Sequence, residues 1–298
     1  MSFRRGARPS PRHRLAAATP HKALAVVPAQ HLVVPSTLSM WLNQTDGDCV
    51  TAEEAFNKAC DGILIADATV QAWASTNNVL NGADLDQVLT LMQSAGFSQD
   101  GNMYNDGAAT SVDWTTQAVL QSALSQGRVK IGVAADQLEA LQSSTSIGVA
   151  NGWVATGFKA DSNEDHCVSL CGYGTIAWLA QLLGGSVPSG VDGTQIGYAM
   201  FTWSTIGIID EPSLLAITGE AWLRSPTTKI VGTGTPAPDV VTTYPAPAPT
   251  PPATGPATLS NAQAWAAAGI QGGDPLQSQD DAIANAIAGL AKYWPSGS

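Results

Sequence analysis

Charge is scarce in this sequence. Only 12% of its 298 residues are Asp, Glu, Lys or Arg, against roughly a quarter in an average soluble domain. The 13 basic and 24 acidic residues leave a formal net charge of −11. An acidic surface repels phosphates, which excludes general nucleic-acid binding by the acidic body. No apolar run approaches the ~20 residues of a membrane-spanning helix, yet 44% hydrophobic residues are too many for a wholly disordered chain.

Cysteine and histidine are also few. There are four of each: Cys49, Cys60, Cys167 and Cys171, and His13, His21, His31 and His166. They lack the close-paired spacing of zinc ligands, so we expect no metal site and no cofactor. Two of the cysteines, four residues apart on one predicted strand, share a face opposite His166. Cys60 could pair with either of them in an oxidising compartment, or all could be buried free thiols.

The basic residues are unevenly placed. Residues 1–45 carry six of them and no acid, whereas the other 253 residues carry seven and all 24 acids. We expect residues 1–37 to be a basic, flexible N-terminal segment, called the head below. It lacks the apolar central stretch of a secretory signal. The compartment therefore stays open between virion, secreted and cytoplasmic.

Proline marks the other end of the chain. Nine of the 18 prolines lie between Pro226 and Pro256, which predicts an extended, semi-stiff Pro/Thr/Ala-rich linker over residues 225–257. A short tail, 258–298, is predicted to form helices near 261–268 and 278–293. Their apolar stripe is too small to fold alone, so we expect it to dock on the main domain or on another chain, by self-association.

Residues 38–224 form the predicted main domain. Capping residues, apolar periodicity and glycine stops predict helices over 49–59, 65–77 and 84–95 and from residue 113. Strands are expected over 128–135, 165–172, 196–203 and 221–223, with helices inserted near 135–142 and within 178–185. Helices followed by a mainly antiparallel sheet make an α+β fold.

A cysteine at a helix start and a distant histidine are the chemically notable pair. Cys49 follows Asp48 at the predicted first turn of a helix, where free N–H groups favour a thiolate. His166 stands on a predicted strand and could take the thiol proton. Gln44, one loop upstream, could donate its amide to an oxyanion beside the Cys49 N–H.

These segments resemble the papain-like cysteine peptidase superfamily. The resemblance rests on NQTDGDCVTAEEAF (43–56), DHCVSLCGYG (165–174) and FTWSTIGI (201–208), and it spans about residues 38–224. It looks closest to compact bacterial and phage members. It implies a papain-like fold, with Cys49 as nucleophile, His166 as base and Gln44 as the oxyanion donor.

The sequence departs from the family pattern at two places. The glutamine usually stands six residues before the cysteine; here Gln44 stands five before it and Asn43 six. The orienting asparagine is expected two residues before the tryptophan of the third motif, where this chain has Phe201. Thr202 or Ser204 is therefore the candidate to hydrogen-bond the imidazole.

Two functions follow from these observations. One is a thiol hydrolase, a peptidase or amidase that acts on a peptide or protein through a Cys–His acyl-enzyme. The other is a weakly active or inactive papain-like module that serves in a structural, virion or surface assembly through its linker and C-terminal helices. An open cleft with thiol and imidazole together favours the first, and a covered cleft favours the second.

Overall fold

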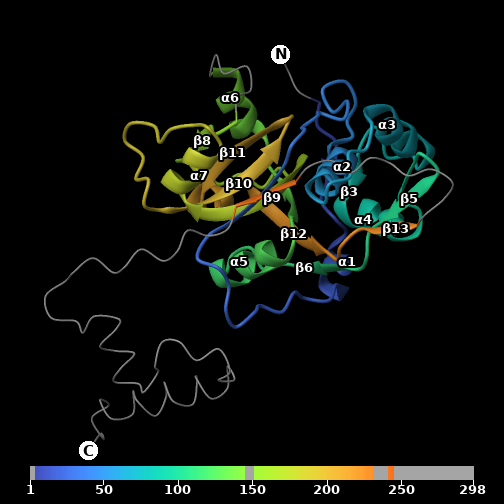
Figure 1. Cartoon of the computed structure of the whole chain (residues 1–298), viewed down its shortest axis with the longest axis horizontal. Helices are drawn as coiled ribbons and strands as arrows, with labels where there is room; N and C mark the ends of the chain where they lie inside the picture. The colour runs from blue at the N-terminus through green and yellow to red at the C-terminus, as the bar shows by residue number, and fades with distance from the viewer. Residues whose placement is uncertain (1–3, 145–150, 231–240, 245–298) are drawn as a thin grey trace, which may run out of the picture. The chain divides into compact units, whose positions relative to one another are not determined.

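Figure 1 shows the computed structural model of the chain, which describes residues 4–144, 151–230 and 241–244. All of them belong to one compact unit, Met1–Pro247. The predicted tail helices, and most of the predicted linker, lie outside the described residues. No helix in the described ranges is both long and apolar enough to cross a membrane.

The helical half of this unit lies on one side of Figure 1. Its helices and short strands are α2 (Cys49–Cys60), α3 (Asp67–Thr76), β3 (Ala83–Asp84), α4 (Leu85–Ser94), β4 (Phe97–Gln99) and β5 (Asn102–Asn105). Each helix packs an apolar face inward; on α4 the buried face holds Leu85, Val88, Leu89 and Met92. The three helices predicted here from periodicity are present, with ends displaced by one or two residues.

The sheet half follows in the chain. Its sheet runs in the order β6 (Ala109–Ser111), β12 (Thr218–Arg224), β7 (Val129–Val133), β9 (His166–Thr175), β10 (Ile196–Thr202), β11 (Thr205–Asp210), β8 (Val154–Ala155). All neighbours in this path are antiparallel except β11 and β8. The prediction of an α+β fold with a mainly antiparallel sheet is confirmed.

Four helices accompany this sheet. They are α5 (Gln117–Gln126), α6 (Asp136–Ser144), α7 (Ile176–Leu182) and α8 (Glu211–Ile217). The two predicted insertions correspond to α6 and α7. The helix expected from Asp113 starts instead at Gln117, because the Asp113 carboxylate accepts hydrogen bonds from Thr115 and Thr116 and holds a separate turn.

The sheet separates two apolar cores. Cys167 and Cys171 on β9 face the first core, which includes the buried residues of α2, α3 and α4. Val168 and Leu170, of opposite parity on the same strand, face the second core with α5 and α8. All four cysteines are buried free thiols, so the structure contains none of the disulfides that the sequence left open.

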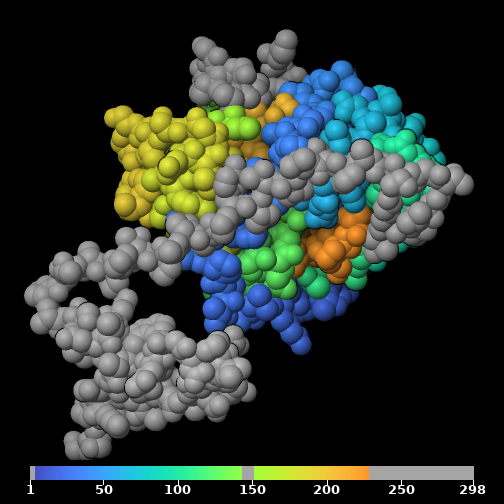
Figure 2. Space-filling view, in the orientation of Figure 1, coloured from blue at the N-terminus to red at the C-terminus, as the bar shows by residue number. Residues whose placement is uncertain are grey.

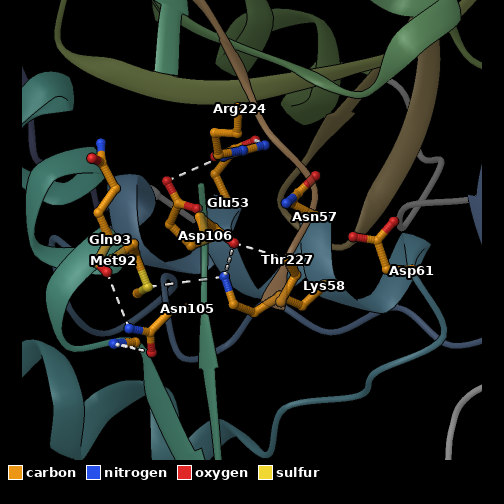
Figure 3. A network of polar contacts seen from close by, with 12 residues as sticks. Glu53, Asn57, Lys58, Asp61, Met92, Gln93, Asn105, Asp106, Arg224 and Thr227 are labelled. Atoms are coloured by element: carbon orange, nitrogen blue, oxygen red, sulfur yellow. Dashed lines mark hydrogen bonds and ion pairs between the residues drawn. The ribbon is translucent and has the colours of Figure 1, made fainter. Parts of the chain in front are cut away.

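A buried ionic cluster joins the two halves, and Figure 3 shows the part of it with Glu53, Lys58, Asp106 and Arg224. It contains three acids and three bases, all almost inaccessible to water: Glu53, Glu54, Asp106, Lys58, Lys130 and Arg224. Lys58 Nζ lies 2.8 Å from Asp106, Arg224 NH2 lies 2.8 Å from Glu53, and Lys130 Nζ lies 2.5 Å from Glu54. Because opposite charges balance within the cluster, α2 can be buried on every side despite its carboxylates and amine.

The head differs from the flexible segment that its composition predicts. Residues from 4 onward are packed on the body and form β1 (Ala7–Arg8), α1 (Arg12–Ala17) and β2 (His31–Pro35). β1 pairs in parallel with β3, and β2 pairs with β9. The head's arginines find acids far away in sequence, as in the Arg14–Asp86 contact of 2.8 Å, and these partners are invisible to local composition.

The predicted linker also begins differently. Thr228–Ile230 is strand β13, antiparallel to β5, and Val241–Tyr244 is strand β14, antiparallel to β2. Each strand satisfies its backbone groups on an edge strand of the body, which a purely extended linker would leave to water. These two stretches of the predicted 225–257 segment therefore belong to the sheets of the main unit.

Candidate active site

Cys49 lies where α2 meets the sheet. It is the first residue of α2, follows the N-cap Asp48, and is 1% exposed. The backbone N–H of Cys167, the second residue of β9, lies near the Cys49 thiol and favours its thiolate form. Since His166 is the first residue of that strand, the thiol lies against the peptide that joins the predicted base to its neighbour. The fold thus places Cys49 beside the start of the strand that carries His166, 117 positions away in the sequence.

The imidazole of His166 is held on two sides. Its Nε2 lies 2.9 Å from Thr202 Oγ1, at the end of β10. Its ring stacks on the indole of Trp203, with centroids 4.5 Å apart and planes 16° from parallel. Nδ1 is buried and has no hydrogen-bond partner among the described residues. With Nε2–H donating to Thr202, Nδ1 is the basic nitrogen that remains to accept a proton.

A tight turn places Trp203 over this ring. Trp203 and Ser204 are the two residues that join β10 to β11, with φ angles of 43° and 63°. Two left-handed residues give the twist that a two-residue hairpin needs, although non-glycine residues adopt this conformation only at a cost. Of the two candidate orienting residues, Thr202 contacts the imidazole, and the hydrogen bonds described for the ring do not include Ser204.

Phe201 stands at the position expected for an asparagine, and its side chain packs in the core instead of contacting the imidazole. It stacks on Phe56 of α2, with ring centroids 4.1 Å apart, and meets Trp41 edge to face at 5.7 Å. It therefore faces the first core between α2 and the sheet. The next residue, Thr202, faces the imidazole because side chains alternate along a strand.

The two amides before Cys49 differ in burial. Gln44, the predicted oxyanion donor, is exposed, whereas Asn43 is 4% exposed and its Oδ1 has no hydrogen-bond partner. Asn43 follows Trp41 and Leu42, whose positive φ angles of 47° and 67° turn the chain sharply ahead of α2. Residue type favours Gln44, whereas the six-residue spacing before the cysteine and burial both favour Asn43.

Residues 5–8 of the head, called the cleft segment below, cover the pair. The backbone N–H groups of Gly6 and Ala7 lie near the Cys49 thiol and favour its thiolate form. The Ala7 N–H also donates to the Asp165 carbonyl oxygen at 3.1 Å, and the Gly6 carbonyl accepts from the Ala83 N–H at 2.9 Å. Figure 2 shows blue atoms of the N-terminal part of the chain on the surface between the cyan helical half and the orange and yellow sheet half.

Burial sets the protonation state of the covered pair. It raises the pKa of the Cys49 thiol to about 11, with the Asp48 carboxylate acting in the same direction. Burial, assisted by the Arg5 charge, lowers the pKa of His166 to about 3. At neutral pH the covered site therefore holds a thiol and a neutral imidazole rather than a thiolate–imidazolium pair.

Asp48 shares this dry environment. Both its carboxylate oxygens are buried and accept no hydrogen bond from another residue. Burial, followed by the nearby charge of Asp46, raises the pKa of Asp48 to about 7. Among the residues described here, no group of three or more His, Cys, Asp or Glu side chains could hold a metal ion.

Comparison with known proteins gives a match only at the level of structure. No known family pattern matches the sequence, and no curated protein resembles it. Digestive procathepsin L 3 of Tenebrio molitor larval midgut has a TM-score of 0.50, at 12% identity, over 70% of this chain and 74% of its own. The proform of the ragweed pollen allergen Amb a 11, a cysteine protease, has a TM-score of 0.49, at 10% identity, over 72% and 73%.

Similarity at this level of identity concerns the fold alone. The chain has a papain-like fold, which confirms the fold expected from the three sequence motifs. Its placement among compact bacterial and phage members stays a prediction, as do the roles of the site residues.

Proposed function

We propose that this chain of papain-like fold is a thiol hydrolase, a peptidase or amidase, whose site is covered by its own head. Cys49 attacks the carbonyl carbon of the substrate and His166 transfers the thiol proton to the leaving amine. Water, deprotonated by His166, then attacks the acyl-enzyme, and the proton returns to the departing thiol. The observation that carries the proposal is the thiol of Cys49 against the first peptide of β9, beside an imidazole with a free Nδ1.

Thr202 is proposed as the positioning residue. Its hydroxyl can accept the Nε2 proton of His166, which keeps Nδ1 unprotonated before attack. It carries neither charge nor amide, so it stabilises the imidazolium formed during the reaction less than a carboxylate does. Trp203, stacked on the ring, limits its rotation.

The oxyanion donor is proposed to come from the loop before α2. The Cys49 N–H at the helix start supplies one donor, and a side-chain amide supplies the other. Asn43 is the better supported amide, because it is buried in the same loop while Gln44 is exposed. In an opened enzyme, Asn43→Ala should lower kcat by roughly 10²-fold, and Gln44→Ala should leave it within about twofold. The reverse pattern would restore Gln44 to the role.

The cleft segment accounts for a latent state. While Gly6 and Ala7 lie on the thiol, no substrate carbonyl reaches it, and burial keeps the pair neutral. When the segment leaves, water and substrate enter, so the thiol and imidazole regain pKa values that permit proton transfer.

Alkylation of the full chain tests the proposal. Arg5→Glu adds a fourth carboxylate against Asp136, Glu139 and Asp165, which expels the cleft segment. At pH 7, iodoacetamide should label Cys49 at least tenfold faster in this variant than in the unaltered chain, and the variant should hydrolyse peptide amides. Labelled cysteines are identified by mass spectrometry.

Two controls make the result specific. Arg14→Glu disturbs the head at Asp86, away from the thiol, and should leave Cys49 labelling unchanged. Cys60, buried at the other end of α2, should stay slow in every variant. If Cys49 of the Arg5→Glu chain reacts no faster than Cys60, and no peptide is hydrolysed, the hydrolase proposal is wrong.

The covered cleft also favours the second candidate, a module for assembly. Its test is the oligomeric state of the full chain against a chain lacking residues 258–298, compared by size-exclusion chromatography over a range of concentrations. Loss of assembly on deletion supports the module. Equal behaviour of the two chains contradicts it.

A further inference from the structure

An arginine side chain occupies a cluster of three carboxylates beside the proposed active site. Arg5 NH1 contacts Asp136 at 2.5 Å and Asp165 at 2.7 Å, and Arg5 NH2 contacts Glu139. Asp136 and Glu139 lie one turn apart at the start of α6, and Asp165 immediately precedes His166 on β9. The two elements thus converge on one guanidinium, whose two terminal nitrogens are both used. That planar fork is a feature that lysine lacks.

Three carboxylates gather around one guanidinium. Arg5 makes an ion pair with each of them, and Asp165 also accepts a hydrogen bond from the Ala135 N–H. A surface contact that only fastened the head would need one acid, as Asp84 serves Arg8 and Asp86 serves Arg14. Carboxylates that share one cation attract it more strongly together than a single carboxylate does.

The position next to Arg5 is closed to side chains. A Cβ on Gly6 would lie 1.7 Å from the carbonyl oxygen of Gly47, two residues before the nucleophile. That carbonyl belongs to backbone and cannot swing aside, so only glycine fits here. The adjoining backbone is also held, through the Ala83 N–H to the Gly6 carbonyl.

These contacts hold a polypeptide segment next to the proposed nucleophile. The thiol of Cys49 is touched by the N–H groups of Gly6 and Ala7, so the segment held by the carboxylates is the one that lies on the reacting sulfur. We propose that Asp136, Glu139 and Asp165 form a subsite for an arginine side chain of a bound polypeptide, next to a position that accepts only glycine. The inference rests on the proposed function, and it assigns peptides with adjacent arginine and glycine as the substrate class.

A binding experiment on the full chain tests this subsite. In the test chain, Arg5→Ala empties the carboxylate cluster and leaves its walls intact, and Gly6→Ala in the same chain displaces the cleft segment, because its Cβ would lie 1.7 Å from the Gly47 carbonyl oxygen. This double variant is called the Arg5→Ala chain below. The probe is a fluorescein-labelled peptide Arg-Arg-Gly-Ala-Arg, the sequence of residues 4–8, followed by fluorescence anisotropy. Replacing its second arginine by citrulline, which keeps the shape and removes the charge, should weaken binding by about tenfold or more. Replacing its glycine by alanine should weaken binding by at least as much.

Substitutions of the carboxylates test whether these side chains cause the preference for arginine. Adding Asp136→Asn and Glu139→Gln to the Arg5→Ala chain should abolish the preference for arginine over citrulline. Adding Asp86→Asn, an acid of the head's surface away from the cleft, should preserve it. The order Gly-Arg is included among the probes, since productive substrates can run in the opposite direction to β1; a preference for arginine in either order supports the subsite.

The outcomes separate the two proposals. Absence of binding, equal affinity for arginine and citrulline, or a preference that survives removal of the two wall charges overturns the subsite. Each of these can occur while Cys49 is still labelled rapidly and peptides are hydrolysed without selectivity, which leaves the hydrolase proposal standing. Conversely, an arginine preference in a chain whose Cys49 is unreactive supports the subsite and contradicts catalysis.

Discussion

At the scale of single residues, the imidazole depends on a hydroxyl. Thr202 Oγ1 is the partner recorded for His166 Nε2, so Thr202→Val, which keeps the shape of the side chain, leaves that nitrogen buried and unpaired. In the opened Arg5→Glu chain we expect kcat to fall by about 10²-fold, the scale of a misdirected general base, with little change in KM. Ser204→Ala is the matched control and should retain kcat. Equal losses in the two variants would contradict the positioning role of Thr202.

Asp48 gives a stability that depends on pH. Its pKa of about 7 in the folded chain exceeds its ordinary 3.8, so the folded state binds more protons than the unfolded state between about pH 4 and 7. Stability from this group is present below pH 4 and is lost as the pH rises to 7. Asp48→Asn should therefore equal the unaltered chain near pH 4 and exceed it at pH 8, by at most about 4 kcal/mol. Urea unfolding at the two pH values measures this; an advantage of the variant that is independent of pH would contradict it.

Some residues of the site could be predicted from the sequence and others could not. Cys49 and His166 could be selected because a helix start and a strand motif are local patterns; the structure places Cys49 beside the start of the strand that begins at His166, and their catalytic roles stay a prediction. The sequence could not decide between Thr202 and Ser204 as the residue that hydrogen-bonds the imidazole, since which of them faces the ring depends on the turn at Trp203. Residue type led to Gln44 as the predicted oxyanion donor, and the burial of Asn43 could not be foreseen, because burial in a loop has no periodic signal.

At the scale of elements, α2 is held by charge as well as by apolar packing. Lys58→Met leaves the Asp106 carboxylate buried without its amine, since the pair is 2.8 Å apart and almost wholly inaccessible (Figure 3). We expect the free energy of unfolding to fall by about 3–5 kcal/mol, measured by urea denaturation. The double variant Lys58→Met/Asp106→Leu should recover much of this, because both charges are gone.

An exposed ion pair provides the control for that experiment. Arg8 pairs with Asp84 at 3.1 Å, with 59% of the arginine side chain exposed. Arg8→Ala should therefore cost less than about 1 kcal/mol. A loss for Lys58→Met as small as this one would mean that the buried cluster contributes little to holding α2.

The same cluster shows why the burial of charged residues on α2 could not be predicted from the sequence. Periodicity located the helices, yet it gave no sign that Glu53, Glu54 and Lys58 of α2 are buried. They are buried because Lys130, Asp106 and Arg224 meet them from distant segments. Such partners are set by the tertiary fold, which local patterns do not encode.

At the scale of the whole molecule, the head is fastened by ionic contacts that water and salt can reach. Arg5 is 21% exposed and Asp136 is 67% exposed at their contact, so added salt screens it, whereas the buried cluster of α2 is screened much less. Raising NaCl from about 0.05 M to 0.5 M, which shortens the screening length severalfold, should speed labelling of Cys49 and leave Cys60 slow. Labelling that is independent of salt would indicate that backbone contacts alone hold the cleft segment.

The covalent continuity of the cleft segment with the site it covers has a kinetic consequence. A tethered ligand acts at an effective concentration that for short flexible tethers is on the order of millimolar, and it cannot be diluted away. Opening of the cleft should therefore be first order and independent of protein concentration, so the half-time of Cys49 labelling should be equal at about 1 and 100 μM. A substrate must therefore compete with a segment that stays covalently attached beside the site.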